Sequence, residues 1–256
     1  MKRITSRDNP RFKALRRLAE SGRERKASGR TLLDGVHLIA ACEANFGSVE
    51  ELIVSETALA LREIVTLLAG REPLVLPDAL FREMAVVDTP SGIMAVIVPP
   101  PAAPPDATVD AVLLDGVQDP GNVGTLMRTA AAAGIRQILL SSDCAGAWSP
   151  KVLRAGQGAH FLLQVIEDVE LSGFARSFGG LVAVTTLAEA TPLYQSDLRP
   201  PLAWVFGSEG RGVRPELLAE ANLRIRIPMA AGVESLNVAA AAAICLFEAL
   251  RQRDPA

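Results

Sequence analysis

Residues 114–134 read LDGVQDPGNVGTLMRTAAAAG, and this stretch decides the fold class. The apolar residues 111–114 predict a buried strand, and the Asp-Pro-Gly sequence at 119–121 predicts a turn directly after it. The alanine-rich residues that follow predict a helix that ends at Gly134. A strand, a short polar turn and a helix in this order form the unit from which α/β domains are built.

Two polar side chains of this stretch are candidates for chemistry. Asn122 stands where a helix N-cap or a loop side chain is expected. Gly124 and Arg128 are four residues apart and share one helix face, where a phosphate passing over the bare glycine backbone would meet the guanidinium. The alternative is that Arg128 forms a surface salt bridge and that the glycines serve only the turn.

Further apolar runs at 137–140, 181–185 and 202–206 predict additional strands that alternate with helices. Each run is apolar at successive positions rather than at every second one, which is typical of strands buried on both faces. The sequence therefore predicts a parallel sheet covered by helices.

A glycine-rich loop follows the last of these strands, where residues 204–213 read WVFGSEGRGV. In open α/β sheets, ligands bind in the crevice beyond the carboxyl ends of the strands. The glycine spacing fits neither the GxGxxG pattern of dinucleotide-binding proteins nor a P-loop, which disfavours both of those ligand classes. Glu209 is the acidic candidate in this loop, unless it only caps the next helix or faces solvent.

A third segment, residues 223–250, combines a strand, a loop and a long helix. The strand is expected to end at 227–228, and Ser235 is expected to be the N-cap of the helix. Five consecutive alanines at 239–243 either favour the helix through their propensity or allow another helix or subunit to approach closely.

The first hundred residues form a separate α/β pattern. Helices are expected at 9–20, 36–44, 58–68 and 78–85, and strands at 49–54, 73–76 and 92–98. Residues 99–105 read PPPAAPP, which cannot form a central strand or continue a helix and therefore predict a short stiff linker. We expect one domain at 1–98, a linker at 99–107 and a second domain at 108–256.

Positive charge is concentrated at the start of the chain. Residues 1–30 hold eleven Lys or Arg against three acids, a net charge of +8. Since the whole chain carries −3, the remaining 226 residues carry −11. Such a segment suits a polyanion such as nucleic acid, although a solvated surface is the alternative.

The composition excludes several classes of protein. With 49% hydrophobic and 21% charged residues, the chain is typical of a globular enzyme. Its three cysteines are far apart and form no CxxC pair, which argues against a disulfide scaffold or a zinc site and favours a reducing cytoplasm. The longest apolar run, 238–247, is half of the about 20 residues that a membrane span needs, and no signal-peptide core opens the sequence. His37 and His160 lie outside the three segments and are expected to be structural or surface residues.

Together, DPGNVGTLMRTAAAAG, FGSEGRG and IPMAAGVESLNVAAAAAICLFEAL, in this order and at these separations, resemble the three motifs of the SpoU (TrmH-like) branch of SPOUT RNA methyltransferases. The N-terminal segment that begins ITSRDNPRFKALRRLAESGRERKASGR resembles the small RNA-binding substrate domain that precedes the catalytic domain in many members. The resemblance implies a C-terminal parallel-sheet domain with a deep trefoil knot, an exception to the rule that chains do not thread loops. It also implies S-adenosylmethionine (AdoMet) bound in the knot, and a homodimer.

Residue roles follow from the resemblance, position by position. The implied catalytic residues are Asn122, Arg128, Glu209, Ser235 and Asn237. The implied AdoMet-binding residues are Thr185, Gly207, Gly212, Ile227, Met229 and Leu236. No metal is implied.

The implied reaction is methyl transfer to a ribose 2′-hydroxyl, a poor nucleophile that must be aligned with the methyl group and relieved of its proton. Because a guanidinium stays protonated in proteins, we expect Arg128 to position phosphate and hydroxyl rather than to act as a free base. Glu209 is expected to orient this group or the ligand, and the Asn and Ser side chains to fix loop and substrate by hydrogen bonds.

The expected substrate is 23S rRNA, because the N-terminal extension resembles rRNA-modifying members more than the tRNA branch. The alternatives are a tRNA, a resistance-related rRNA site, or a non-catalytic RNA-binding or assembly protein that keeps the fold. The sequence leaves the methylated nucleotide and the general base open.

Overall fold

The computed structural model describes residues 2–85, 90–186, 189–233 and 235–254. The chain forms two compact units, each described here by itself. The first consists of Met1–Pro101 and Trp148–Phe161, and the second of Ala102–Ala147 and Leu162–Ala256. The expected second domain, 108–256, thus includes Trp148–Phe161, which packs with the first unit instead.

A five-stranded mixed sheet forms the centre of the first unit, in the order β1-β4-β3-β5-β2. β1, β4 and β3 run parallel, whereas β5 is antiparallel to β3 and β2. The strands are β1 (Lys2–Arg3), β2 (Thr31–Asp34), β3 (Glu51–Ser55), β4 (Leu74–Leu76) and β5 (Ile93–Ile97).

Helices cover both faces of this sheet, because side chains alternate between faces along each strand. On one face, α1 and α5 pack on Leu32, Ile53 and Met94; on the other, α3 and α4 pack on Leu33 and Val54. The helices of this unit are α1 (Pro10–Glu20), α2 (Gly22–Ser28), α3 (Val36–Phe46), α4 (Arg62–Leu68) and α5 (Asp78–Met84), with the 3-10 turn η1 (Thr57–Ala60). The predicted amphipathic helix at 9–20 is confirmed: Asn9 caps it, and its apolar seam is buried.

Residues 148–161 join the first unit through their apolar and polar side chains. α7 (Pro150–Gly156) and the 3-10 turn η2 (Ala159–Phe161) add Leu153 and Phe161 to the core on the α3 side. The Thr31 hydroxyl donates to the carbonyl oxygen of Trp148 at 2.6 Å, and Arg154 pairs with Asp34 at 3.3 Å. No feature of the local sequence indicated this association.

The second unit contains a seven-stranded sheet in the order β10-β12-β9-β11-β6-β7-β8, with every pair parallel. This confirms the predicted parallel sheet. The strands are β6 (Ala111–Asp115), β7 (Gln137–Leu140), β8 (Gln164–Ile166), β9 (Leu181–Thr185), β10 (Thr191–Pro192), β11 (Leu202–Gly207) and β12 (Leu223–Arg226). β6 and β7 are buried at every position, as expected of strands covered on both faces.

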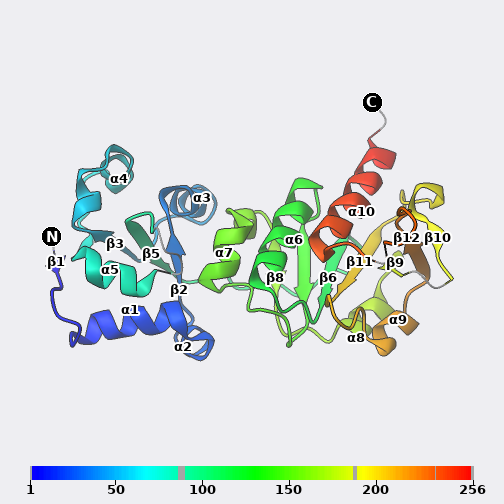
Figure 1. Cartoon of the computed structure of the whole chain (residues 1–256), viewed down its shortest axis with the longest axis horizontal. Helices are drawn as coiled ribbons and strands as arrows, with labels where there is room; N and C mark the ends of the chain where they lie inside the picture. Colours follow the sequence, from blue (N-terminus) through cyan, green and yellow to red (C-terminus); the bar gives the residue numbers. More distant parts are fainter. Residues whose placement is uncertain (1, 86–89, 187–188, 234, 255–256) are drawn as a thin grey trace. The chain divides into compact units, whose positions relative to one another are not determined.

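Helices lie on both faces of the second sheet (Figure 1). α8 (Leu171–Ser177) and α9 (Pro215–Ala219) pack on one face in a core with Leu113, Val184 and Val205. α6 (Pro120–Ala132) and α10 (Val238–Arg253) pack against each other. The remaining short turn of this unit is η3 (Leu193–Gln195).

Two predicted helix starts are wrong. Asn237, and not Ser235, caps α10, since its side-chain oxygen accepts from the backbone N–H groups of Ala239 and Ala240. Asp119, and not Asn122, caps α6, and it accepts from the backbone N–H of Asn122 itself at 2.8 Å. In both places two capping-type residues lie within three positions, so the local sequence does not decide between them.

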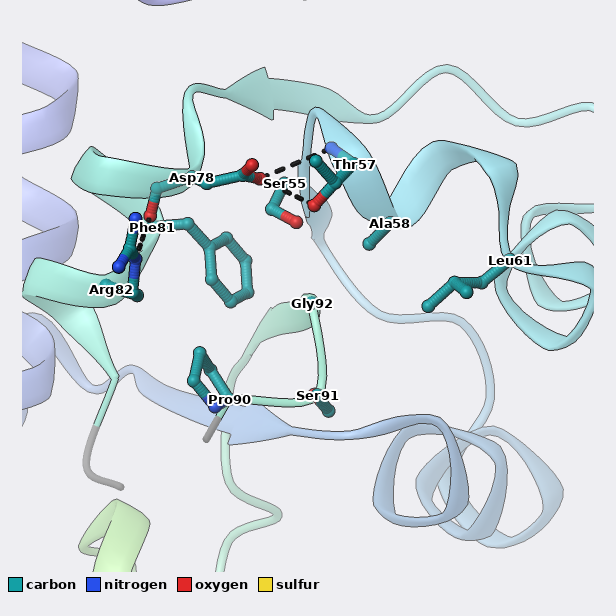
Figure 2. A pocket seen from close by; sticks show the side chains of 10 residues that line it. All are labelled: Ser55, Thr57, Ala58, Leu61, Asp78, Phe81, Arg82, Pro90, Ser91 and Gly92. Atoms are coloured by element: carbon teal, nitrogen blue, oxygen red, sulfur yellow. Dashed lines mark hydrogen bonds between the residues drawn. The ribbon is translucent and has the colours of Figure 1, made fainter. Parts of the chain in front are cut away.

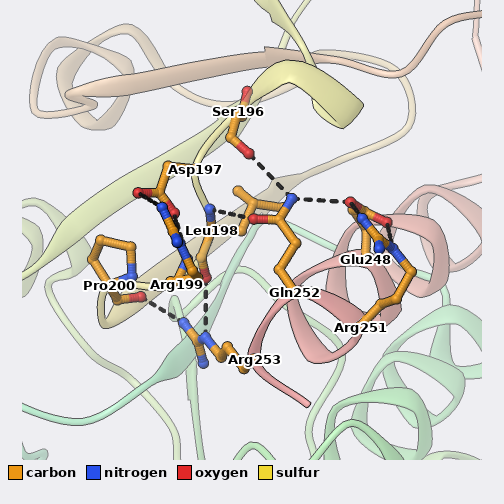
Figure 3. Close-up of polar contacts among 9 residues, drawn as sticks. All are labelled: Ser196, Asp197, Leu198, Arg199, Pro200, Glu248, Arg251, Gln252 and Arg253. Atoms are coloured by element: carbon orange, nitrogen blue, oxygen red, sulfur yellow. Dashed lines mark hydrogen bonds and ion pairs between the residues drawn. The ribbon is translucent and has the colours of Figure 1, made fainter. Parts of the chain in front are cut away.

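Polar contacts fasten the last turn of α10 to the connection before β11 (Figure 3). Gln252 accepts from the Leu198 backbone N–H at 2.9 Å and donates to the Ser196 carbonyl at 3.1 Å. Arg253 donates to the Leu198 carbonyl at 3.0 Å and pairs with Asp110. Side chains of α10 therefore bind backbone groups that lie about fifty residues earlier in the chain.

The proline-rich linker has no regular secondary structure, and its second half is bound to the second unit. The Gln164 amide donates to the carbonyls of Ala103 and Pro104, and Gln137 exchanges hydrogen bonds with Asp106. Within the described residues, no helix is long and apolar enough to cross a bilayer.

Candidate active site

The carboxyl ends of four neighbouring strands meet at one edge of the second sheet. Pairing places Ile225 of β12 beside Thr185 of β9, and Gly207 of β11 beside Asp115 of β6. The loops that leave this edge carry the three segments singled out in the sequence. Parallel pairing brings the first segment to the other two, although Asn122 lies 87 residues before Glu209 and 115 before Asn237.

Three of the predicted catalytic side chains form one hydrogen-bonded chain. The Asn122 amide donates to the Glu209 carboxylate, and the Asn237 amide donates to the Asn122 side-chain oxygen at 3.0 Å. Asn122 lies in the first turn of α6, Glu209 lies in the loop after β11, and Asn237 caps α10. The Asn237 amide thus orients the Asn122 side chain, and the Asn122 amide orients the Glu209 carboxylate. Glu209 does not cap α9, because the N-cap position of that helix is Arg214.

Arg128 lies on the exposed side of α6, six residues beyond Asn122. Among the described residues it forms no hydrogen bond or ion pair with its side chain, so the salt-bridge alternative is not supported. Gly124 is buried, which makes the predicted approach over its backbone wrong. The solvent-facing route to Arg128 passes over Thr125, which is exposed and one turn before it.

The loop before α10 also lines a pocket of about 160 Å³. Two of the pocket residues, Ser235 and Leu236, directly precede Asn237 in the sequence. Four of the predicted AdoMet-binding residues line the pocket, namely Thr185, Ile227, Met229 and Leu236, together with Ser235, Thr186, Ile225 and Ala241. Ser235 therefore lies at the pocket rather than in the Asn122–Glu209–Asn237 chain. Sequence analysis missed Ile225, which lies in β12 two residues before Ile227 and lines the same pocket.

The other two predicted cofactor residues, Gly207 and Gly212, do not line this pocket. They lie against each other, because a β-bridge between Ser208 and Gly212 closes the loop after β11. A Cβ atom at Gly207 would overlap the backbone of Gly212 and Val213. The glycine is therefore required by the close approach of two backbone segments.

An ion pair between Asp115 and Arg214 holds the end of the same loop. Asp115, at the end of β6, has a side chain that is 1% exposed and accepts from Arg214 through the backbone N–H at 2.7 Å and through Nε at 2.6 Å. The hydrogen bond that Arg214 donates to Asp115 raises the pKa of Arg214. Asp143 lies 3.9 Å from the same guanidinium. Sequence analysis missed this pair, whose partners are 99 residues apart.

The basic segment 1–30 lies in the first unit, and most of its charges are paired. Ion pairs among the described residues include Arg3–Glu56, Arg7–Glu83, Arg11–Glu51, Lys13–Asp8, Arg16–Glu20, Arg17–Glu24 and Arg30–Glu50. The net positive charge around this segment in the folded protein is therefore smaller than the net charge of the segment alone. Since these pairs are exposed, each contributes about 0–1 kcal/mol, and a phosphate can replace the carboxylate.

The described histidines and two buried cysteines do not point to another chemistry. Among the described residues, no cluster of His, Cys, Asp and Glu could hold a metal ion. Burial raises the pKa of the Cys42 thiol to about 11 and that of Cys245 to about 12, so neither is a ready nucleophile. His160 is fully buried and packs beside Trp148, whereas His37 is exposed.

Comparison with known families covers most of the chain. Residues 111–247 match the model of the SpoU rRNA Methylase family, and residues 9–95 match an MRM3-like substrate binding domain. The first match contains all the predicted site residues, and the second contains most of the first unit.

Full-length relatives and solved structures have similar sequences and folds. An uncharacterized tRNA/rRNA methyltransferase of Synechocystis is 36% identical, over 98% of this chain and 94% of its own length. The 23S rRNA (guanosine(2553)-2'-O)-methyltransferase RlmP of Bacillus subtilis is 32% identical, over 96% and 98%. An AdoMet-bound rRNA methyltransferase from Sinorhizobium meliloti superimposes with a TM-score of 0.82 at 28% identity, covering 98% of this chain and 97% of that one.

Proposed function

Because the chain belongs to the SpoU rRNA methylase family, we propose that it transfers a methyl group from AdoMet to a ribose 2′-hydroxyl of 23S rRNA. The similarity to the Bacillus subtilis enzyme extends over both units, and that enzyme is named for this reaction on 23S rRNA. The substrate-binding match in the first unit supports RNA as the substrate.

One observation carries the proposal: a single loop serves both the pocket and the polar chain. Ile227, Met229 and Leu236 line the pocket, and Asn237, the next residue, donates to Asn122. The group held in the pocket and the group held at Asn122 are thereby placed by the same backbone. A transferase needs this arrangement, since donor and acceptor must be aligned before the reaction.

The lining of the pocket fits AdoMet. Apolar side chains of Ile227, Met229 and Leu236 suit the faces of an adenine ring, and the hydroxyls of Thr185 and Ser235 can exchange hydrogen bonds with polar edges. At about 160 Å³ the pocket is smaller than the roughly 300–1,000 Å³ of whole-ligand pockets, so it encloses part of the cofactor. When bound, AdoMet supplies an electrophilic methyl group on its sulfonium.

The five predicted catalytic residues then have distinct roles. The exposed Arg128 binds an RNA phosphate and holds the ribose in position, as a permanently charged group. Asn122 and Asn237 hold the Glu209 carboxylate in one orientation, so that it can align Arg128 or the substrate hydroxyl. Ser235 acts from the cofactor pocket, where its hydroxyl orients the donor.

Three further features belong to the proposal. The first unit, including segment 1–30, binds rRNA, with phosphates replacing the carboxylates that now pair its cations. The chain acts in the cytoplasm as a homodimer, supported by Phe247 and Leu250 of α10, which are 46% and 36% exposed. The C-terminal segment is threaded as a trefoil knot, with which the place of β12 between β9 and β10 is consistent.

Replacement of Arg128 tests the proposal. We expect Arg128→Ala to lower methyl transfer to 23S rRNA at least about 100-fold, because one positioned charge at the acceptor is lost, while AdoMet affinity changes less than about twofold. Arg136→Ala is the matched control, since Arg136 is an exposed arginine of the same unit at the opposite edge of the sheet. An Arg128→Ala enzyme with unchanged rate would remove the role assigned to this residue.

A further inference from the structure

The first unit contains a second pocket, of about 410 Å³, at the carboxyl edge of its own sheet (Figure 2). β3 ends there at Ser55, β4 leads through Pro77 into Asp78, and the loop 90–92 closes the pocket before β5. Gly92 shapes this loop: its φ of +84° is in the left-handed region, and a Cβ there would overlap Ala58. All lining residues fall within the segment that matches a substrate-binding domain.

A fixed carboxylate forms the polar end of this pocket. Asp78 accepts from the Thr57 backbone N–H at 3.2 Å and from the Thr57 hydroxyl at 2.9 Å, as Figure 2 shows. These contacts, with a weaker one from Ser55, lower the pKa of Asp78, so the group is ionised at neutral pH. Both hydrogen bonds from Thr57 end on Oδ1 of Asp78, and since a carboxylate has about four acceptor positions, Oδ2 offers positions for the donors of a ligand.

A cation and apolar side chains complete the lining. Nε of Arg82 donates to the Asp78 carbonyl at 3.3 Å, which fixes the guanidinium at the rim, and within the described residues Arg82 forms no ion pair. Ala58, Leu61 and Pro90 supply apolar surface opposite the carboxylate. The pocket therefore combines an acceptor, an apolar wall and a guanidinium that forms no ion pair among the described residues.

These groups match one unpaired nucleotide better than a duplex. The volume is that of a small-molecule site, and proteins that bind single-stranded RNA hold splayed bases through their Watson–Crick edges. Guanine presents two adjacent N–H donors on that edge, which suits a carboxylate. Uracil presents one N–H between two carbonyl oxygens, which a carboxylate repels.

We propose that this pocket binds one unpaired guanine nucleotide of the RNA substrate, with Asp78 accepting from the base N–H groups and Arg82 facing the phosphate. The inference rests on the proposed function in one respect, namely that the substrate is RNA. The site selects where the enzyme docks and takes no part in methyl transfer.

Nuclear magnetic resonance on the isotope-labelled full-length protein tests this pocket, with the single-stranded pentanucleotides UUGUU and UUUUU as probes. We expect saturable shifts at Thr57, Ser91 and Gly92 with UUGUU, and affinity at least about tenfold higher than for UUUUU. Asp78→Asn should remove this preference while keeping the oxygen that accepts from Thr57. Arg82→Ala should weaken both probes by the same factor.

Asp106→Asn is the matched control, because Asp106 is exposed and holds Thr108 by the same pair of hydrogen bonds outside the pocket. Equal affinities for the two probes, an unaltered preference in Asp78→Asn, or shifts only outside the pocket would each overturn the proposal. The same preparations are assayed for methyl transfer to 23S rRNA. Methyl transfer without pocket binding overturns the pocket alone, and pocket binding without methyl transfer overturns the proposed function alone.

Discussion

Removal of the Arg214 side chain is expected to destabilise the second unit, because Asp115 then remains buried without the two contacts that it receives from the guanidinium. The Asp115 side chain is 1% exposed and receives Nε of Arg214 at 2.6 Å and Nη2 at 2.5 Å. Arg214→Ala leaves the backbone N–H at 2.7 Å as the remaining contact from this residue.

The size of the effect follows from the unequal burial of the two partners. Breaking a fully buried pair costs about 3–5 kcal/mol, and breaking an exposed pair costs about 0–1 kcal/mol. Arg214 is 51% exposed, so water partly replaces its charge. We therefore expect Arg214→Ala to lower the free energy of unfolding by about 2 kcal/mol, and Arg214→Lys by less, since a lysine keeps the charge but loses the forked geometry.

Urea unfolding followed by tryptophan fluorescence measures this change. The chain has two tryptophans, and in a Trp148→Phe background Trp204 on β11 reports the second unit alone. Protein concentration is held constant across variants, because a dimer would make stability concentration-dependent. Arg199→Ala is the control, since Arg199 binds Asp197 through the same two nitrogens with both side chains more than half exposed. Equal losses in Arg214→Ala and Arg199→Ala would refute the reasoning.

Three further changes have defined outcomes. Gly207→Ala should lower the free energy of unfolding by about 2–3 kcal/mol in the same assay, because its Cβ would meet the backbone of Gly212 and Val213. Gly210→Ala, which has open space around it, should lower it by less than about 1 kcal/mol, and equal losses would contradict the close approach. The hydrogen bond from Arg251 lowers the pKa of Glu248 to about 2 from the usual 4.5, so this carboxylate stabilises the fold above about pH 4.5 and loses that contribution as pH falls towards 2. The difference in unfolding free energy between wild type and Glu248→Gln should therefore shrink across that window, and a pH-independent difference would exclude the ion pair as its cause. Iodoacetamide at pH 8 should label Cys245 at least about 100-fold more slowly in the native than in the urea-unfolded protein, because burial raises the pKa of its thiol to about 12. Equal labelling rates would show that the thiol is accessible in the native protein.

The sequence predicts those parts of the fold that depend on short-range pattern. β7 and β9 have the bounds expected from their apolar runs, since strands buried on both faces differ from their polar surroundings at every position. The starts of α6 and α10 were misplaced because neighbouring residues compete for the same capping role.

Long-range pairing explains what the sequence could not predict. The place of β12 between β9 and β10, and the packing of Trp148–Phe161 in the first unit, depend on contacts with residues far away in the chain. The hydrogen bonds of Asn122 to Glu209 and Asn237 were expected only as a convergence of motifs, without the order of donors and acceptors. The net charge of +8 in segment 1–30 is partly balanced by carboxylates from later in the chain, among them Glu50, Glu51 and Glu83.

Methyl transfer itself is the most direct measurement of the central claim. Purified protein is incubated with methyl-labelled AdoMet and, separately, with unmodified 23S rRNA and bulk tRNA, and the labelled nucleotide is located by nuclease digestion and mass spectrometry. The proposed function predicts label in 23S rRNA, on a ribose 2′-oxygen of one nucleotide, and none in tRNA. Label on a base, label in tRNA alone, or no label from a protein that binds AdoMet would contradict it.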